Sequence, residues 1–216
     1  QEPGGRTMIQ GSEEWVEARL GRVTASVISD VMAKGRSGAP SATRANLLAR
    51  IVAERLSGRA AEGFTSQAMQ HGIDTEAQAR ACYTMETGQN VDEVGFVPHP
   101  SIAMAGASPD GLVGERGLVE IKCPNTATHI DTILTGAVPD KYLKQMLFQM
   151  ACTGRDWCDF VSFDPRMPDE MQLFIKRVPR DDEAIAEIEA AVLAILAEAD
   201  ELIAKLTAKF AGKEAA

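Results

Sequence analysis

Residues 108–124 have the sequence SPDGLVGERGLVEIKCP, in which an acidic turn leads into an apolar run that carries Glu-x-Lys. Side chains alternate along a strand, so Glu120 and Lys122 are expected on one face and their apolar neighbours on the other. The intervening glycines favour a tight hairpin over 112–118, which returns Asp110 to the side of Glu120. Adjacent carboxylates repel each other, and a divalent metal removes that conflict while the lysine acts on a water molecule. The stretch therefore predicts a magnesium-dependent phosphodiesterase site.

The length and composition are those of one globular domain. The chain has 216 residues, of which 45% are hydrophobic and 25% are charged. We expect a loose leader over 1–12 and a single domain over 13–216, with a catalytic core over about 66–178 and a C-terminal helix over about 181–212. No run of about 18 apolar residues is present, so we expect no membrane span.

Charge and cysteine content narrow the function classes. The net charge of −9 argues against a simple basic nucleic-acid binder, although many acids lie within 169–201 and basic residues gather within 6–59. A locally positive face on an acidic protein therefore stays open. The four cysteines form no Cys-x-x-Cys pair, which indicates buried free thiols in a reducing compartment and disfavours a zinc or iron–sulfur site.

Apolar periodicity and capping residues predict alternating helices and strands. Helices are expected over 13–20, 24–33, 43–56, 66–87 and 139–153, and strands over 91–98, 102–105, 110–114, 117–123, 157–163 and 171–178. The last helix carries an apolar stripe at intervals of three and four, from Ile185 to Leu206. We expect this stripe to pack on the chain's own sheet, with a subunit contact as the alternative.

One carboxylate in the helix over 66–87 shares a face with apolar residues. Glu76 recurs with Ile73, Arg80 and Tyr83 at helical spacing, which turns it inward and requires a partner for its charge. A salt bridge to Arg80 is one interpretation. The presence of the Asp110, Glu120 and Lys122 pattern favours a second interpretation, in which Glu76 has a role at the metal or next to it.

Six motifs in order resemble those of the phage lambda exonuclease and YqaJ-like viral recombinase family, within the PD-(D/E)xK nuclease superfamily. They are Arg19-Leu20-Gly21-x-Val23-Thr24-Ala25-Ser26, Arg36-Ser37-Gly38, Gly72 with Glu76, Ser108-Pro109-Asp110-Gly111-Leu112, Glu120-x-Lys122-Cys123-Pro124 and Phe163-Asp164-Pro165-Arg166-Met167. The resemblance implies an α/β (α+β) fold with a restriction-endonuclease-like core, in which helices flank a central mixed β-sheet and a long helix ends the chain.

The resemblance also implies an activity. It is a 5′→3′ exonuclease that digests one strand of linear double-stranded DNA to mononucleotides, with two Mg²⁺ ions that Mn²⁺ can replace. The 3′ single-stranded overhang serves a partner, a single-strand annealing protein. The enzyme forms a ring-shaped homotrimer on DNA ends and is encoded by a phage or prophage, so it acts in the bacterial cytoplasm.

The resemblance assigns metal-site roles by position in the motifs. Asp110 bridges the two ions, while Glu120 and the backbone carbonyl of Ile121 hold one of them. Lys122 activates or orients the water, and Glu76 supports the metal directly or through water.

A second set of residues matches positions that bind DNA. The resemblance gives the 5′-phosphate pocket as Arg19, Ser26, Ser108 and Gln145, and further DNA contacts as Arg36 and Thr24. Read without the resemblance, Arg19 is as readily a surface helix residue, Ser26 a helix cap and Gln145 a solvated side chain.

Departures from the family concern strand separation. The region 39–46 is shorter and less aromatic than expected, and 125–129 lacks an arginine of the best-known member. Two alternatives stay open: an endonuclease or junction resolvase of the same superfamily, and a non-catalytic DNA-end-binding module. An exonuclease should digest linear duplex and leave a closed circle intact, whereas an endonuclease or resolvase need not. A non-catalytic module should leave the DNA unchanged whether or not magnesium is present.

Overall fold

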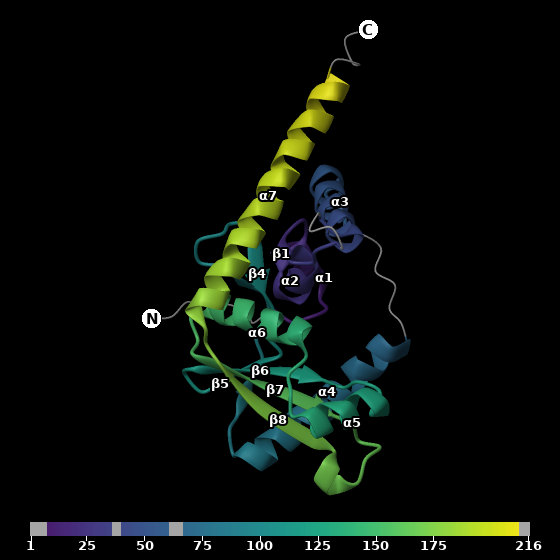
Figure 1. Cartoon of the computed structure of the whole chain (residues 1–216), viewed down its shortest axis with the longest axis vertical. Helices are drawn as coiled ribbons and strands as arrows, with labels where there is room; N and C mark the ends of the chain where they lie inside the picture. Colours follow the sequence, from purple (N-terminus) through teal and green to yellow (C-terminus); the bar gives the residue numbers. More distant parts are fainter. Residues whose placement is uncertain (1–7, 36–39, 61–66, 212–216) are drawn as a thin grey trace.

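The computed structural model describes residues 8–35, 40–60 and 67–211, with side chains of the last range from residue 75 onward. Most of the expected leader and all of the Arg36 motif lie outside these residues. Helices and strands alternate along the chain, and a long helix, α7, extends away from the body (Figure 1). The predicted α/β fold class with a central mixed sheet and a long C-terminal helix is confirmed.

The central sheet carries the hairpin quoted above. Its strands have the order β2-β5-β6-β7-β8, in which β6 and β7 are parallel and the other neighbours antiparallel. Their bounds are β2 Val91–Asp92, β5 Gly111–Val113, β6 Gly117–Lys122, β7 Trp157–Phe163 and β8 Leu173–Pro179. A smaller sheet has the order β1-β4-β3, from β1 Val23–Thr24, β4 Ala105–Ala107 and β3 Val97–Pro98.

Helices cover both faces of the central sheet. In Figure 1, α6 lies on one side of the sheet strands and α4 on the other. The helices are α1 Glu13–Arg19, α2 Ile28–Val31, α3 Ala42–Ser57, α4 Gln67–Thr87, α5 Thr126–Thr135, α6 Asp140–Thr153 and α7 Asp182–Ala211, with 3₁₀ turns η1 Ala25–Val27 and η2 Asp169–Met171. Two apolar clusters result, one under α6 that extends to α7, and one under α4.

The β5–β6 hairpin has the predicted geometry. Gly111 pairs with Val119 and Val113 with Gly117, so the turn is short, and Gly114 adopts the left-handed backbone with φ 53°. A side chain at Gly117 would collide with the ring of Trp157, at 2.1 Å from the nearest ring atom. The hairpin therefore needs glycine at both places.

The long helix α7 departs from expectation. Its stripe begins buried, at Ile185, Ile188, Val192, Ile195 and Ala199. It packs mainly against α2, α3 and α6 and not on the sheet, so that prediction was wrong. The reason is that α6 already covers this face of the sheet. Further along, Leu202 and Leu206 are exposed.

Further regions differ from the predicted elements. The predicted strand over 91–98 is two short strands, β2 and β3, in different sheets, and the strand expected over 102–105 lies later, at β4. The segment 24–33 contains the end of β1, then η1, then the four-residue α2, and it is not one helix. Thr24 pairs with Gly106 of β4, and its side chain makes no capping bond. The pattern predicts no element over 126–135, where α5 lies, capped by Asn125.

In the part of the chain that the structure describes, no helix combines the length and the apolar character that a membrane span requires.

Candidate active site

The hairpin brings the first two predicted side chains together. Because Gly111 pairs with Val119, Asp110 lies level with Glu120 on the adjacent strand. Asp110 Oδ2 accepts a hydrogen bond of 2.7 Å from the backbone N–H of Ile121. Side chains alternate as predicted: Val119 and Ile121 belong to the apolar cluster under α4, and Glu120 lies on the opposite face, which α6 covers.

Glu120 is fully buried and is held by three donors. Lys122 Nζ forms an ion pair with Oε1 of Glu120. Two amides of α6 complete the set: Gln145 Nε2 donates to Oε1 at 2.6 Å, and Gln149 Nε2 donates to Oε2 at 2.5 Å. Gln145 and Gln149 are four residues apart and therefore share one face of the helix. A buried carboxylate is tolerated here because both of its oxygens are hydrogen-bonded.

The electrostatics show excess negative charge at this place. Burial and the nearby Glu120 carboxylate raise the pKa of Asp110 to about 8, with a smaller contribution from Glu76. Lys122 responds in the opposite way. Burial alone would lower the pKa of Lys122, but the carboxylates of Glu120 and Asp110 outweigh it and raise that pKa above its ordinary value. Lys122 therefore stays an ammonium at neutral pH, 5.3 Å from the centre of the Tyr142 ring.

Glu76 lies on the edge of the site and has another partner. Its Oε1 accepts a hydrogen bond of 2.7 Å from Nη2 of Arg80, the salt bridge weighed from sequence, and its side chain is 33% exposed. Arg80 also pairs with Glu93. In the part of α4 whose side chains are described, from residue 75 onward, the buried positions are Thr75, Ala79 and Tyr83, so Glu76 flanks the inward face and does not point into its centre.

The donor set suits a hard divalent cation. Among the residues that the structure describes, no group of three or more His, Cys, Asp and Glu side chains is arranged to hold a metal ion. What the hairpin does offer is two carboxylates beside the backbone of Ile121. Magnesium is usually bound by one or two carboxylates, several waters and substrate phosphates. The raised pKa of Asp110 comes first from burial and then from the Glu120 carboxylate, and the Lys122 ammonium offsets it only in part.

A cationic cluster lies at the other end of the Ser108–Pro109–Asp110 motif. Arg19, the last residue of α1, donates from Nη1 to Ser108 Oγ at 3.1 Å and stacks 4.1 Å above the centre of the Trp15 ring. Trp15 Nε1 donates to the same hydroxyl at 2.9 Å. Nη2 of Arg19 lies 3.5 Å from the hydroxyls of Thr24 and Ser26. Arg19 thus faces three hydroxyl groups from separate segments.

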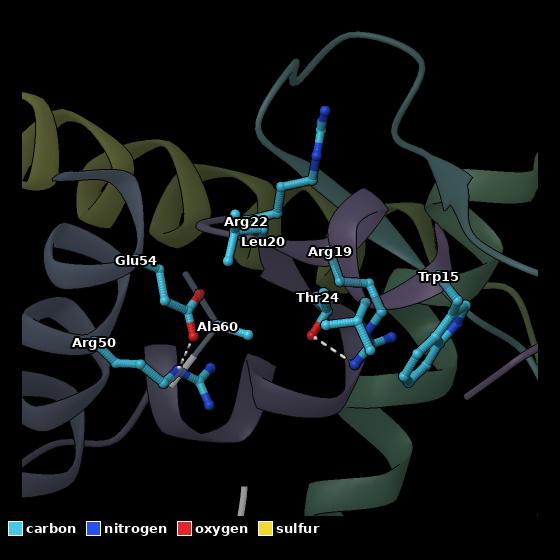
Figure 2. Close-up of a pocket in the computed structure, with 9 residues that line it drawn as sticks. Trp15, Arg19, Leu20, Arg22, Thr24, Arg50, Glu54 and Ala60 are labelled. Atoms are coloured by element: carbon cyan, nitrogen blue, oxygen red, sulfur yellow. Dashed lines mark hydrogen bonds and ion pairs between the residues drawn. The ribbon is translucent and has the colours of Figure 1, made fainter. Parts of the chain in front are cut away.

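This cluster borders a pocket of about 150 Å³ between α1, β1 and α3 (Figure 2). Its lining includes Trp15, Arg19, Thr24, Arg50 and Glu54. Burial, followed by repulsion from the Arg50 guanidinium, lowers the pKa of Arg19 to about 10, which leaves it charged at neutral pH. Arg50 forms an ion pair of 3.9 Å with Glu54 in the same pocket, whereas Arg19 faces neutral hydroxyls, so the Arg19 end is the suitable environment for an anion.

The predicted pocket residues divide between the two places. Arg19, Ser26, Ser108 and Thr24 are together. Gln145 donates its amide to Glu120, so in this structure it belongs to the carboxylate centre. Arg36 lies outside the described residues. Sequence reasoning assigned no role to Trp15 or Gln149, although the latter had a signal: it is an amide four residues after Gln145 within an otherwise buried apolar run.

Known proteins are similar to this chain in sequence and in fold. The family model of the YqaJ-like viral recombinase domain matches residues 14–156. An alkaline exonuclease from Laribacter hongkongensis (LHK-Exo) is 54% identical, with a TM-score of 0.87 over 93% of this chain and 99% of that chain. Its complex with dAMP gives a TM-score of 0.88 at the same identity and coverage.

A phage related exonuclease from Haemophilus somnus 129PT is 19% identical, with a TM-score of 0.70 over 88% of this chain and 99% of that chain, and shows the fold alone. Comparison with curated proteins gives no match. The matched region includes the Arg19 cluster, the Asp110–Lys122 hairpin and helix α6. The chain belongs to the YqaJ-like viral recombinase family.

Proposed function

We propose that this protein is a magnesium-dependent 5′→3′ exonuclease that digests one strand of linear duplex DNA to mononucleotides. The observation that carries the proposal is the convergence of Asp110, Glu120 and Lys122 at the β5–β6 hairpin. The 54% identity to an alkaline exonuclease over nearly the whole chain supports the same activity. That relative's complex with dAMP supports a nucleotide product.

The carboxylates would hold the metal. Asp110 and Glu120, with the carbonyl of Ile121, provide oxygen ligands, and Glu76 supports the site directly or through water, with one of its oxygens held by Arg80. When two divalent ions are bound, they supply stabilisation of the attacking and leaving oxygens of the phosphodiester. Mn²⁺ shares the preference for oxygen ligands and would substitute.

Lys122 orients the water. Its ammonium is held by Glu120 on one side and lies above the Tyr142 ring on the other, which fixes the direction of its remaining protons. The Lys122 side chain lies beside the carboxylates, where it would position the nucleophile and stabilise developing negative charge.

The Arg19 cluster would bind the terminal 5′-phosphate. A guanidinium binds a phosphate in a bidentate manner, and the hydroxyls of Thr24, Ser26 and Ser108 add neutral hydrogen-bond donors. Ser108 is two residues before Asp110, so the chain itself connects the phosphate pocket to the carboxylate centre. A terminal phosphate enters such a pocket more deeply than an internal phosphodiester, which explains exonuclease action and direction.

The wider assembly is proposed from the family alone. We propose a ring-shaped homotrimer on double-stranded DNA ends, a single-strand annealing protein as the partner that takes the 3′ overhang, and a cytoplasmic location in the bacterial host. The net charge of −9 requires that any DNA-facing surface gather the basic residues, of which Arg19, Arg22 and Arg50 line the pocket beside α1.

The test is digestion of linear and closed-circular duplex of the same sequence. We expect Mg²⁺-dependent loss of the linear DNA from its 5′ ends, release of mononucleotides, an intact circle, and no reaction in EDTA. A labelled 5′ end should appear as mononucleotide before any internal label does.

Two outcomes contradict the proposal in different ways. Cleavage of the closed circle would show an endonuclease that shares the metal centre. Binding to DNA ends without hydrolysis at any Mg²⁺ or Mn²⁺ concentration would show a non-catalytic end-binding module.

A further inference from the structure

Gln149 is a polar side chain in a place that otherwise holds apolar ones. It lies in the middle of α6 between Met146 and Cys152, a run in which every residue is buried, and its own exposed fraction is 0%. An amide in such surroundings is unfavourable unless its hydrogen bonds are satisfied. Its position therefore requires a reason beyond packing.

The only strong partner of the Gln149 amide among the described residues is Glu120. Nε2 of Gln149 donates to Oε2 at 2.5 Å, whereas Oε1 of Gln149 has only the weak thiol donor Cys158, at 4.0 Å. Gln145 and Lys122 both engage the other oxygen, Oε1 of Glu120. Gln149 alone fixes the second oxygen and, with it, the rotation of the carboxylate plane.

We propose that Gln149 is a positioning residue that holds the Glu120 carboxylate in the orientation in which it binds a divalent cation. The inference rests on the proposed function, in which Glu120 is a metal ligand. A carboxylate held at one oxygen only can rotate about its last bond, and the entropy of fixing it then opposes metal binding. Hydrogen bonds to ligating carboxylates commonly change metal affinity or activity by about 10- to 100-fold.

Three variants test the proposal. Gln149→Met keeps the length of the side chain and suits the apolar surroundings, but it removes the donor. Gln149→Asn keeps the amide but is one methylene shorter, so it does not reach Oε2. The matched control is Leu147→Met, a change of similar size on the same buried helix at a residue outside the contacts of Glu120.

Affinity for Mn²⁺ is measured by electron paramagnetic resonance without DNA, after circular dichroism and thermal melts establish that each variant is folded. We expect the Met and Asn variants to bind Mn²⁺ about 10- to 100-fold more weakly than the parent and the Leu147→Met control. In DNA digestion, the Mg²⁺ concentration for half-maximal rate should rise by the same factor. At saturating Mg²⁺, KM for DNA should stay within about twofold of the parent value.

A purely structural role of Gln149 predicts that the variants lose thermal stability but keep the Mn²⁺ affinity of the parent. If both folded Gln149 variants bind Mn²⁺ within twofold of the parent, the inference is overturned, whatever their melting temperatures. If the Met variant does not fold, the Asn variant decides by the same criterion, and failure of both to fold while the control folds likewise assigns Gln149 to stability alone. A parent chain that binds no Mn²⁺ overturns the proposed function itself, which separates that failure from this one.

Discussion

The carboxylate centre and the Arg19 pocket are built in opposite ways. The centre is formed by one hairpin and one helix face, its key carboxylate is fully buried, and each oxygen of that carboxylate has a short hydrogen bond. The pocket joins α1, β1, η1 and the end of β4, and its Arg19–Thr24 and Arg19–Ser26 contacts are 3.5 Å long. Contacts of that length are weak. The comparison indicates a carboxylate centre with short hydrogen bonds and a more loosely held guanidinium, whose contact of ordinary length is the one with Ser108.

The largest expected effect on the carboxylate centre comes from substitution of Lys122. Lys122→Ala should lower the rate of DNA hydrolysis by about 10²- to 10⁴-fold, because the variant loses the group that orients the water in the proposed function. Folding and Mn²⁺ binding should change little, since Gln145 and Gln149 still hold Glu120. The measurement is single-turnover digestion at saturating Mg²⁺, with Mn²⁺ titration alongside.

Lys141→Ala is the matched control, because Lys141 also lies near the Tyr142 ring but makes no ion pair with Glu120 among the described residues. Digestion by Lys122→Ala at the rate of that control would remove the lysine from the mechanism.

The second effect is on the stability of the metal-free protein. The pKa of Asp110 is about 8 in the fold and about 3.9 in an unfolded chain, so the folded state binds the proton more tightly. This contribution is complete below about pH 4 and is lost as pH rises towards 8. Between pH 5 and 8.5 in EDTA, we expect a loss on the order of a few kcal/mol, or several degrees in Tm.

Asp110→Asn isolates this contribution, because other groups also titrate in that interval. At pH 8.5 in EDTA the variant should have the higher Tm, and at low pH this difference should narrow or reverse. Mg²⁺ should restore the Tm of the parent at pH 8.5. Parallel Tm curves for the two proteins would show that Asp110 is not a strained carboxylate.

The pocket should give a smaller and more selective effect. Arg19→Ala should reduce the preference for 5′-phosphorylated over unphosphorylated ends by roughly tenfold, because one charge-assisted hydrogen-bonding partner is lost. The ratio of kcat/KM values on the two DNA ends measures it. Arg116→Ala removes the same charge from an exposed turn of the hairpin and should leave the ratio unchanged. Equal ratios for Arg19→Ala and the parent would show that the pocket is misassigned.

Ser26 should give the smallest effect. Its side chain is exposed and lies 3.1 Å from Thr24 Oγ1, which remains in a Ser26→Ala variant. We expect a change of less than about threefold in the same ratio, since a neutral hydrogen bond contributes about 1 kcal/mol or less. A loss as large as that of Arg19→Ala would mean that the pocket is already as ordered as the carboxylate centre.

The same contrast explains what sequence alone could predict. The hairpin was predictable because alternation, glycine turns and the distance between Asp110 and Glu120 are local properties. Helix α5 was not, because its sequence is rich in threonine and isoleucine, and tertiary contacts hold it: His129 is fully buried between Ser162, at 2.7 Å, and the carbonyl of Met171, at 2.9 Å.

The Arg19 pocket and the contacts of Gln145 and Gln149 could not be predicted from local sequence patterns alone. From sequence, Arg19 is equally a surface arginine, and only the resemblance placed it with Ser108, 89 residues away along the chain. The side of α6 on which Gln149 lies was predictable from helical spacing, but its partner Glu120, on the sheet face that α6 covers, required the structure. The assignment of Gln145 to the phosphate pocket stays a prediction, and the contact that the structure shows for its amide is with Glu120 of the carboxylate centre.

The most direct test of the central claim is to locate the cation. Crystals grown with Mn²⁺ should show an anomalous scattering peak within coordination distance of carboxylate oxygens of both Asp110 and Glu120, and Asp110→Asn crystals should lose it. A parent crystal at saturating Mn²⁺ with no peak between these two side chains would contradict the account.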